Sequence, residues 1–187
     1  MSEPVRLLVS ILNFGQPANV LRQLQSLPGW LSDLGAQSDI ASRIVIRNND
    51  PRADIAALAD RVRDLHAEFP DIPCNLVGFV PNVGFGGGHN ANIALYPSDY
   101  VLILNDDIGF PSLGWLEEAI RMLAVDPRTA CVGADENPRN INPHFGNGLL
   151  PGAFNLHGIQ YAEASVLLFS RAAFDRLGGF SADYPWA

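Results

Sequence analysis

The stretch Tyr100-Val-Leu-Ile-Leu-Asn-Asp-Asp107 places three short polar residues directly after a continuous apolar run. An uninterrupted run of this length is typical of a strand buried on both faces, as in a parallel sheet covered by helices. Ligands bind such sheets beyond the carboxyl ends of the strands. The stretch therefore predicts a buried strand over 100–104 and a candidate functional site that begins at Asn105.

Strand and helix patterns alternate on both sides of this stretch. Short strands are predicted over 5–12, 43–47, 75–80, 129–133 and 164–169, and helices over 20–27, 55–69, 86–95 and 116–123. We expect Pro28 and Gly29 to stop the first helix. We expect Asp50 and Pro51 to start the second, with Asp50 as its cap. The alternation predicts an α/β fold with a mostly parallel sheet covered by helices.

Composition limits the classes of protein that this chain can represent. Its 187 residues include 12 basic and 20 acidic side chains, for a net charge of −8, so we expect one globular domain without a nucleic-acid partner. Two distant cysteines, Cys74 and Cys131, cannot form a disulfide framework or a zinc cluster, and we expect both in the core. Since no apolar run approaches the roughly 20 residues of a membrane span, a cytoplasmic location is the default expectation.

The three polar residues after the central strand suit a divalent cation. If the extended conformation continues, Asn105 and Asp107 point to one side and Asp106 to the other. A carboxylate and an amide at this spacing, together with water, can hold Mg²⁺ or Mn²⁺. The same residues also suit a turn and the cap of the next helix, so both interpretations stay open. Polar residues follow three other predicted strands, at Asn13, 48–50 and 82–90.

A glycine-rich stretch over 84–88 follows the third predicted strand. It resembles the start of a dinucleotide fingerprint, but the third glycine of that pattern falls on His89, so the pattern fails. One interpretation is a flexible turn before a helix. The interpretation that we favour is a backbone that approaches a nucleotide or sugar, with Asn82 and Asn90 as amide donors. His89 is expected to be a partly buried polar residue beside the glycines.

A long aperiodic region covers 135–160. It contains five Asn, four Gly and three Pro, and so long a connection in a compact domain is usually functional or mobile. We expect this region to cross the mouth of the site and to become ordered when a ligand binds.

These motifs, in this order, resemble family 2 glycosyltransferases of the GT-A fold, particularly the rhamnosyltransferase-like branch. The resemblance runs from about residue 5 to residue 180, and the asparagine–glycine and aspartate segments carry most of its specificity. It implies a GT-A-like α/β/α sandwich. The matching segments are 9–13, 44–51, 82–90, 102–108, 163–171 and 177–180.

The resemblance implies an inverting transfer of a sugar, with rhamnose as one candidate. The donor would be a nucleoside diphosphate sugar, and the acceptor a glycan or a lipid-linked molecule, as in polysaccharide biosynthesis. Asp107 would bind Mg²⁺ or Mn²⁺, with Asn105 and Asp106 beside it near the ribose or sugar. The implied nucleoside pocket consists of Asn13, Asn48 and Asp50, and the implied floor near the donor of Asn82, Gly84, Gly86 and Asn90. Such an enzyme can also associate with a membrane surface.

The sequence departs from the family at two places. Where the family usually has Asp-Asn after the second strand, this chain has Asn48-Asn49-Asp50. After Gly-Gly-Phe the family continues with acidic segments that supply the general base, whereas here Asp183 is the only acidic residue after Gly179. We therefore expect one domain over 1–187 without the usual C-terminal part. Asp183 is the candidate base, and the alternative function is donor binding without efficient transfer.

A sugar-1-phosphate nucleotidyltransferase is a further alternative. Such enzymes hold a triphosphate with a glycine-rich, basic loop after the first strand. The segment over 13–17 has one glycine and no nearby lysine, which disfavours this class.

Overall fold

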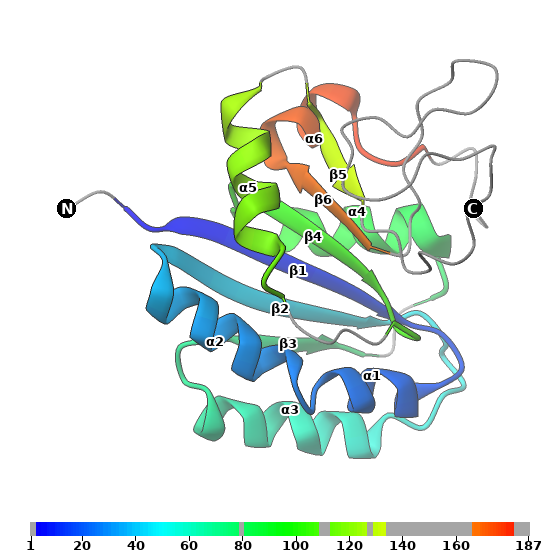
Figure 1. The fold of residues 1–187 in the computed structure, drawn as a ribbon. Helices are drawn as coiled ribbons and strands as arrows, with labels where there is room; N and C mark the ends of the chain where they lie inside the picture. Colours follow the sequence, from blue (N-terminus) through cyan, green and yellow to red (C-terminus); the bar gives the residue numbers. More distant parts are fainter. Residues whose placement is uncertain (1–2, 79–80, 109–112, 127–128, 134–165, 182–187) are drawn as a thin grey trace, which may run out of the picture.

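The computed structural model describes residues 3–78, 81–108, 113–126, 129–133 and 166–181. They form one six-stranded sheet in the order β3-β2-β1-β4-β6-β5 (Figure 1). The strands are β1 (Val5–Asn13), β2 (Ile40–Asn48), β3 (Cys74–Val77), β4 (Tyr100–Asn105), β5 (Cys131–Gly133) and β6 (Val166–Ser170). The helices are α1 (Pro17–Gln23), α2 (Leu27–Gln37), α3 (Ala56–Glu68), α4 (Gly84–Leu95), α5 (Leu116–Val125) and α6 (Arg171–Leu177).

The sheet is mostly parallel, as the sequence predicts. Strand β1 pairs in parallel with β2 and β4, and β2 pairs in parallel with β3. Strand β6 runs antiparallel to both β4 and β5. The carboxyl ends of β2, β1 and β4 therefore lie side by side at one edge of the sheet, which is where the sequence places its candidate site.

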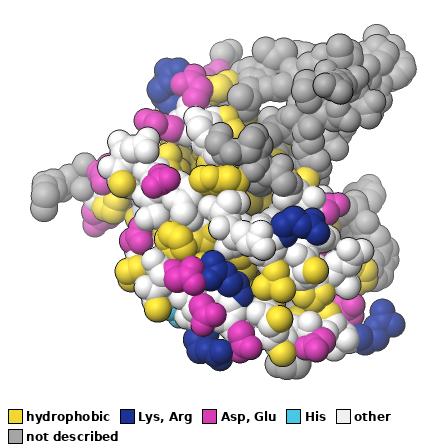
Figure 2. Space-filling model, turned by 60° about the horizontal axis from the view of Figure 1, so that its bottom comes forward, with side chains coloured by type: hydrophobic (Ala, Val, Ile, Leu, Met, Phe, Trp, Pro, Cys, Tyr) yellow, Lys and Arg dark blue, Asp and Glu magenta, His cyan; other side chains and the backbone are white. Residues whose placement is uncertain are grey.

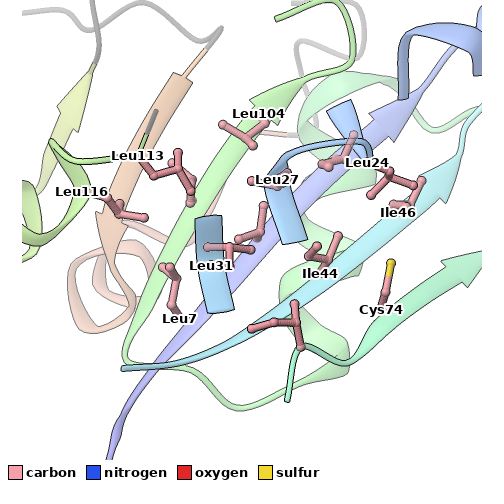
Figure 3. Close-up of a cluster of buried hydrophobic side chains, with 14 of the residues drawn as sticks. Leu7, Leu24, Leu27, Leu31, Ile44, Ile46, Cys74, Leu104, Leu113 and Leu116 are labelled. Carbon is pink, nitrogen blue, oxygen red and sulfur yellow. The ribbon is translucent and has the colours of Figure 1, made fainter. Parts of the chain in front are cut away.

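Helices cover both faces of the sheet, so the central strands are buried on both sides. The larger cluster packs α1, α2, α3 and α5 against one face, and α4 and α6 pack on the other. Alternation along β1 explains the two clusters, because Leu7, Val9 and Ile11 face the first while Leu8 faces the second. Figure 3 shows the larger cluster, with Leu24 and Leu27 between α1, α2 and the sheet. Of the described helices, none is long and apolar enough to cross a bilayer.

Three local predictions are wrong. Pro28 and Gly29 do not stop a helix but lie in the first turn of α2, where proline needs no backbone donor. Asp50 does not cap α3, which begins at Ala56; the Asp50 carboxylate accepts a hydrogen bond from the Arg52 amide in a tight turn instead. Helix α6 (Arg171–Leu177) was missed: the hydroxyl of its N-cap residue Ser170 accepts from the Ala173 N–H, and its C-cap residue Gly178 has a positive φ of 83°.

The surface over α1, α2 and α3 carries mixed charges. Figure 2 shows arginine and acidic side chains interspersed on this face, with no region of one sign. The long region predicted over 135–160 lies outside the described residues.

Candidate functional site

The ends of β1 and β2 are joined through two asparagine side chains. Asn13 and Asn48 are partners in the parallel register, and the Asn13 Nδ2 donates to Asn48 Oδ1 at 2.8 Å. The Asn49 backbone N–H also donates to the Asn13 carbonyl at 2.8 Å. Both side chains are buried, and Asn13 Oδ1 has no hydrogen-bond partner among the described residues. A buried acceptor without a partner is costly and is therefore a candidate contact for a bound ligand.

The same pair positions Asp50. Asn48 Nδ2 donates to the Asp50 carbonyl at 2.8 Å, which closes the turn after β2. The Asp50 carboxylate is mostly buried and lies beside the loop after β1, because a Cβ built on Gly15 would lie 3.9 Å from its Oδ2. Gly15 itself has a φ of +78°, a conformation that other residues rarely adopt. The structure thus brings Asn13, Asn48 and Asp50 together.

The end of β4 places two carboxylates in a turn. Strand β4 stops at Asn105, so strand alternation does not extend to Asp107. The turn that the sequence offered as an alternative is confirmed, but these residues do not cap the next helix, since α5 has Trp115 at its N-cap. Asp106 is half-buried, and its carboxylate lies near the Phe14 backbone N–H, which places this turn beside the end of β1. Asp107 is exposed. The turn interpretation does not exclude a metal site, because both carboxylates remain at the carboxyl edge of the sheet.

Burial and charge raise the pKa of Asp106. Removal from solvent is the larger cause, the Phe14 N–H opposes it, and the neighbouring Asp107 carboxylate adds to it. Asp106 Oδ2 is buried without a hydrogen-bond partner among the described residues. This orphaned oxygen is what one expects of a carboxylate whose partner is a ligand hydroxyl or a cation.

Gln23 is a residue of this site that the sequence interpretation missed. It is the last residue of α1, it is buried, and its Nε2 donates to the carbonyls of Asn105 at 2.5 Å and of Ile108 at 3.0 Å. A signal was present in the sequence. Gln23 lies at helical spacing within the apolar stripe of Val20, Leu24 and Leu27, and this pattern could have indicated a polar side chain that faces the core.

A cleft of about 260 Å³ lies next to Gln23 and the turn after β4. Its apolar lining residues are Leu27, Trp30, Leu104 and Ile108. Its polar lining residues are Arg22, Gln23, Gln25 and Ser26.

The glycine-rich segment is explained by close packing within the protein. A Cβ on Gly86 would lie 2.7 Å from the Phe180 Cβ, and one on Gly88 would lie 2.9 Å from the Leu12 side chain. Position 86 therefore needs glycine because Phe180 packs against it, and not because a ligand approaches the backbone there, as the sequence interpretation expected. Gly84 begins α4 with a φ of +75°, and its N–H donates to Asn82 Oδ1 at 2.9 Å. These two residues form the turn that leads into the helix.

Asn49 connects this glycine segment to the rest of the site. Its Nδ2 donates to the Gly84 carbonyl at 3.0 Å, and its Oδ1 accepts from the Val83 N–H at 3.3 Å. Asn82 and Gly84 are thereby held at the end of β2, close to the nucleoside pocket that the resemblance implies.

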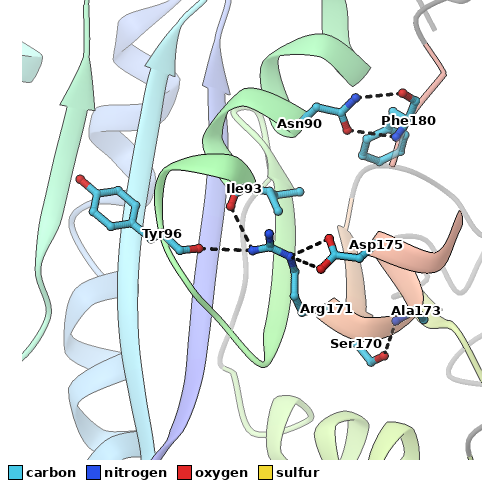
Figure 4. A network of polar contacts seen from close by, with 8 residues as sticks. All are labelled: Asn90, Ile93, Tyr96, Ser170, Arg171, Ala173, Asp175 and Phe180. Carbon is cyan, nitrogen blue, oxygen red and sulfur yellow. Dashed lines mark hydrogen bonds and ion pairs between the residues drawn. The ribbon is translucent and has the colours of Figure 1, made fainter. Parts of the chain in front are cut away.

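Asn90 faces the segment after α6. Its Nδ2 donates to the Phe180 carbonyl at 2.8 Å and its Oδ1 accepts from the Phe180 N–H at 3.0 Å (Figure 4). The nearby Arg171 guanidinium donates to the carbonyls of Ile93 and Tyr96 at the end of α4. Both ends of the Asn90 amide are thus used within the protein, which identifies it as a connection between α4 and the Phe180 segment. Asp183 lies outside the described residues.

A buried polar network lies between β1, β2 and α4. Ser10 Oγ is 2.8 Å from His89 Nδ1 and accepts from Asn92 Nδ2 at 3.1 Å, and Arg47 Nε donates to Asn92 Oδ1 at 2.9 Å. The Ser10 hydroxyl can either donate to His89 Nδ1 or accept from it, according to the tautomer of the ring. Burial lowers the pKa of His89 to about 3 and also lowers the pKa of Arg47. The sequence interpretation expected His89 to be partly buried, and it is fully buried.

The turn after β4 fits a hard divalent cation that is shared with a ligand. Within the described residues no group of three or more His, Cys, Asp or Glu side chains could hold a metal on its own. Mg²⁺ and Mn²⁺ need only one or two protein carboxylates when phosphate oxygens and water complete the shell. Asp107 is exposed and Asp106 has an unpaired oxygen, so this turn supplies that donor set.

Solved structures resemble this chain, although no protein-family model and no curated protein matches its sequence. A mannosyltransferase, PcManGT from Pyrobaculum calidifontis in complex with GDP-Man and Mn²⁺, aligns with a TM-score of 0.69 at 18% identity, over 96% of this chain and 48% of that chain. TarS 1–349 from S. aureus aligns with a TM-score of 0.64 at 11% identity, over 98% and 52%. Its complex with UDP-GlcNAc gives 0.65 at 12% identity, over 93% and 48%.

The fold is therefore that of the GT-A-like glycosyltransferases, a mixed α/β architecture with a mostly parallel six-stranded sheet. At these identities the likeness establishes the fold and not the substrate. The chain spans about half the length of these solved structures.

Proposed function

We propose that this chain is a metal-dependent glycosyltransferase domain that uses a nucleoside diphosphate sugar as its donor. One observation carries the proposal: on a GT-A-like sheet, three adjacent parallel strands bring their polar ends into direct contact. Asn13 donates a hydrogen bond to Asn48, and the Phe14 N–H lies close enough to the Asp106 carboxylate to lower its pKa. These contacts unite the implied nucleoside pocket with the implied metal site in one place.

Asp107 is the proposed metal ligand. Its exposed carboxylate would hold Mg²⁺ or Mn²⁺, while the donor diphosphate and water complete the coordination. The bound ion would offset the negative charge that develops on the leaving diphosphate. This arrangement lets a chain of net charge −8 bind an anionic donor, because the other proposed contacts are largely neutral amides.

The other residues would orient the donor. Asp106 would accept a hydroxyl of the ribose or sugar through its unpaired Oδ2, with Asn105 beside it. Asn13 would accept a donor hydrogen through its unpaired Oδ1, next to Asn48 and Asp50 in the nucleoside pocket. Asn82, Gly84 and Asn90 would shape the site indirectly, because they hold the segments that border it.

The finer assignments follow from the resemblance in sequence. They are family 2, the rhamnosyltransferase-like branch, an inverting reaction, and a glycan or lipid-linked acceptor used in polysaccharide biosynthesis. An inverting transfer requires a carboxylate that accepts the proton of the acceptor hydroxyl, and Asp183 is the candidate in this chain.

A screen of nucleotide sugars by thermal unfolding tests the proposed function. GDP-mannose, UDP-N-acetylglucosamine and a nucleoside diphosphate rhamnose would be added with Mn²⁺, with Mg²⁺ and with EDTA. A ligand that binds only the folded chain raises its melting temperature with occupancy, and we expect a rise that needs the divalent ion. If no nucleotide sugar raises the melting temperature under any condition, the proposal is wrong.

Donor binding without efficient transfer is the second candidate function. Assays of donor hydrolysis and of transfer to acceptors separate the two. Turnover supports the transferase, and metal-dependent binding without turnover supports the binding domain.

A further inference from the structure

Gln23 holds both ends of the turn that carries the two site carboxylates. Its single amide nitrogen donates to the carbonyl of Asn105, just before the carboxylates, and to that of Ile108, just after them. The side chain is 7% exposed, so water competes little for these bonds. Gln23 thus fixes the distance between the two ends of the turn.

Asp107 depends on this anchor more than Asp106 does. The Asp106 carboxylate has its own contact with the Phe14 N–H. The exposed Asp107 side chain makes no hydrogen bond or ion pair with any residue in the described part of the chain, so within that part the backbone of the turn sets its position. Whatever fixes that backbone fixes where the Asp107 carboxylate lies.

Burial of the Gln23 amide in the core also has a free-energy cost. Its Oε1 is buried without a hydrogen-bond partner among the described residues, a cost that an apolar side chain would avoid. Val20, which lies on the same face of α1, and Leu24, which follows the last residue of α1, are apolar and buried. The two bonds to the turn are the contacts that offset this cost.

We propose that Gln23 is a positioning residue for divalent-cation and donor binding, which acts by holding the 105–108 turn in the conformation that presents Asp107. The proposal rests on the proposed function of Asp107 as a metal ligand. It does not require Gln23 to touch the donor or the ion.

The chain provides a matched set of variants. The cleft beside Gln23 leaves room for side chains of similar length, so Gln23→Met removes the two bonds without overfilling the core. Gln23→Glu keeps the shape but turns an oxygen toward two carbonyl oxygens. Gln25 lines the same cleft, is exposed, and makes no bond to the turn among the described contacts, so Gln25→Glu adds the same charge nearby as a control.

Calorimetry tests the proposal in two titrations. The first uses Mn²⁺ alone. The second uses a nucleotide sugar that binds the wild type, once with Mn²⁺ present and once with EDTA. Two lost hydrogen bonds predict binding about tenfold weaker in Mn²⁺ for Gln23→Met, and weaker still for Gln23→Glu. Gln25→Glu should match the wild type, and none of the four proteins should bind the donor in EDTA. Weaker binding of Mn²⁺ alone, in variants that are still folded at the titration temperature, distinguishes positioning of Asp107 from a direct contact with the donor. Wild-type affinity in Gln23→Met and Gln23→Glu, or equal loss in Gln25→Glu, would overturn the proposal.

Hydrogen exchange of the ligand-free protein provides a second readout. The amides of the 105–108 turn should exchange faster in Gln23→Met than in the wild type, while those of β1 stay unchanged. If the turn is equally protected in both proteins, Gln23 does not anchor it and the proposal fails. If the wild type binds neither Mn²⁺ nor any nucleotide sugar, the proposed function fails first, and exchange still decides whether Gln23 anchors the turn.

Discussion

The side-chain amide of Asn13 donates a hydrogen bond of 2.8 Å to the amide oxygen of Asn48, across the ends of two adjacent parallel strands. The Asn48 amide is itself held in place, because its Nδ2 donates to the Asp50 carbonyl. Asn48 can therefore orient the Asn13 amide. The pair therefore fixes the direction of the unpaired Asn13 Oδ1. A small set of neutral side chains thus prepares one end of the site before any ligand binds.

Replacement of Asn13 by aspartate should destabilise the protein. The carboxylate cannot donate to Asn48 Oδ1, so two oxygens would face each other in a buried position. We expect the free energy of unfolding in urea to fall by about 1–3 kcal/mol, with weaker donor binding. Asn19→Asp is the control, because Asn19 makes only an exposed contact of 3.4 Å to Gln16. Equal stability of the two variants would contradict the importance of the Asn13–Asn48 pair.

Replacement of Asp106 by asparagine should change stability and binding in opposite directions. Burial of the carboxylate, and next the charge of Asp107, raise the pKa of Asp106, and its Oδ2 is unpaired. A neutral amide avoids the cost of burying this charge, so we expect a higher unfolding midpoint at pH 7 without metal, and weaker donor binding. Asp39→Asn, at an exposed position, serves as the control. A variant that loses stability, or that keeps full donor affinity, argues against the proposed role of Asp106.

His89 should make the protein sensitive to acid. Burial lowers its pKa in the folded state to about 3, below the usual 6.5, so the unfolded chain binds the proton between these values. Stability is therefore retained above about pH 6.5 and is lost as the pH falls toward 3. Between pH 7 and pH 5 this residue alone should lower the free energy of unfolding by about 2 kcal/mol.

The matched variant for this test is His89→Gln, which can still accept from Ser10 but does not titrate. Its overall stability can differ from that of the wild type, so the quantity compared is the change between pH 7 and pH 5. We expect that change to be smaller by about 2 kcal/mol in urea unfolding curves. An identical change in both proteins would show that His89 is protonated equally in the folded and unfolded states.

Two glycine-to-alanine substitutions in helices should have opposite effects. In α4, a Cβ on Gly86 would lie 2.7 Å from the Phe180 Cβ, so Gly86→Ala should cost about 1–3 kcal/mol of unfolding free energy. In α2, a Cβ on Gly29 would meet the Phe69 ring at an ordinary 3.8 Å, so Gly29→Ala should stabilise by up to about 1 kcal/mol. Thermal unfolding measures both, and a stabilised Gly86→Ala would show that the Phe180 segment does not pack here.

Much of the fold could be predicted because its signals are local. The apolar run before Asn105 indicates a strand buried on both faces, and β4 is the central strand that this run predicts. The stripe of Leu58, Val62 and Leu65 likewise indicates α3. The polar strand ends could be placed together because parallel strands share their carboxyl edge.

The missed features depend on contacts that are distant in sequence. Pro28 resembles a helix stop unless one knows that α1 has already ended at Gln23. The role of Gln23 appears only when α1 packs beside the turn after β4, which is 82 residues away. Gly86 resembles a ligand-binding glycine until Phe180 fills the space beside it. The sequence pattern around each of these residues does not reveal the distant residue that it contacts.

The most direct test of the central claim is calorimetric titration of a nucleotide sugar into the wild type and into Asp107→Asn, each with Mn²⁺ and with EDTA. Asp33→Asn, which changes an exposed carboxylate on α2, is the control. We predict donor binding that requires Mn²⁺ in the wild type and in the control. In Asp107→Asn, with its unfolding midpoint preserved, we predict that this Mn²⁺-dependent binding disappears. Full Mn²⁺-dependent donor affinity in Asp107→Asn would contradict the account.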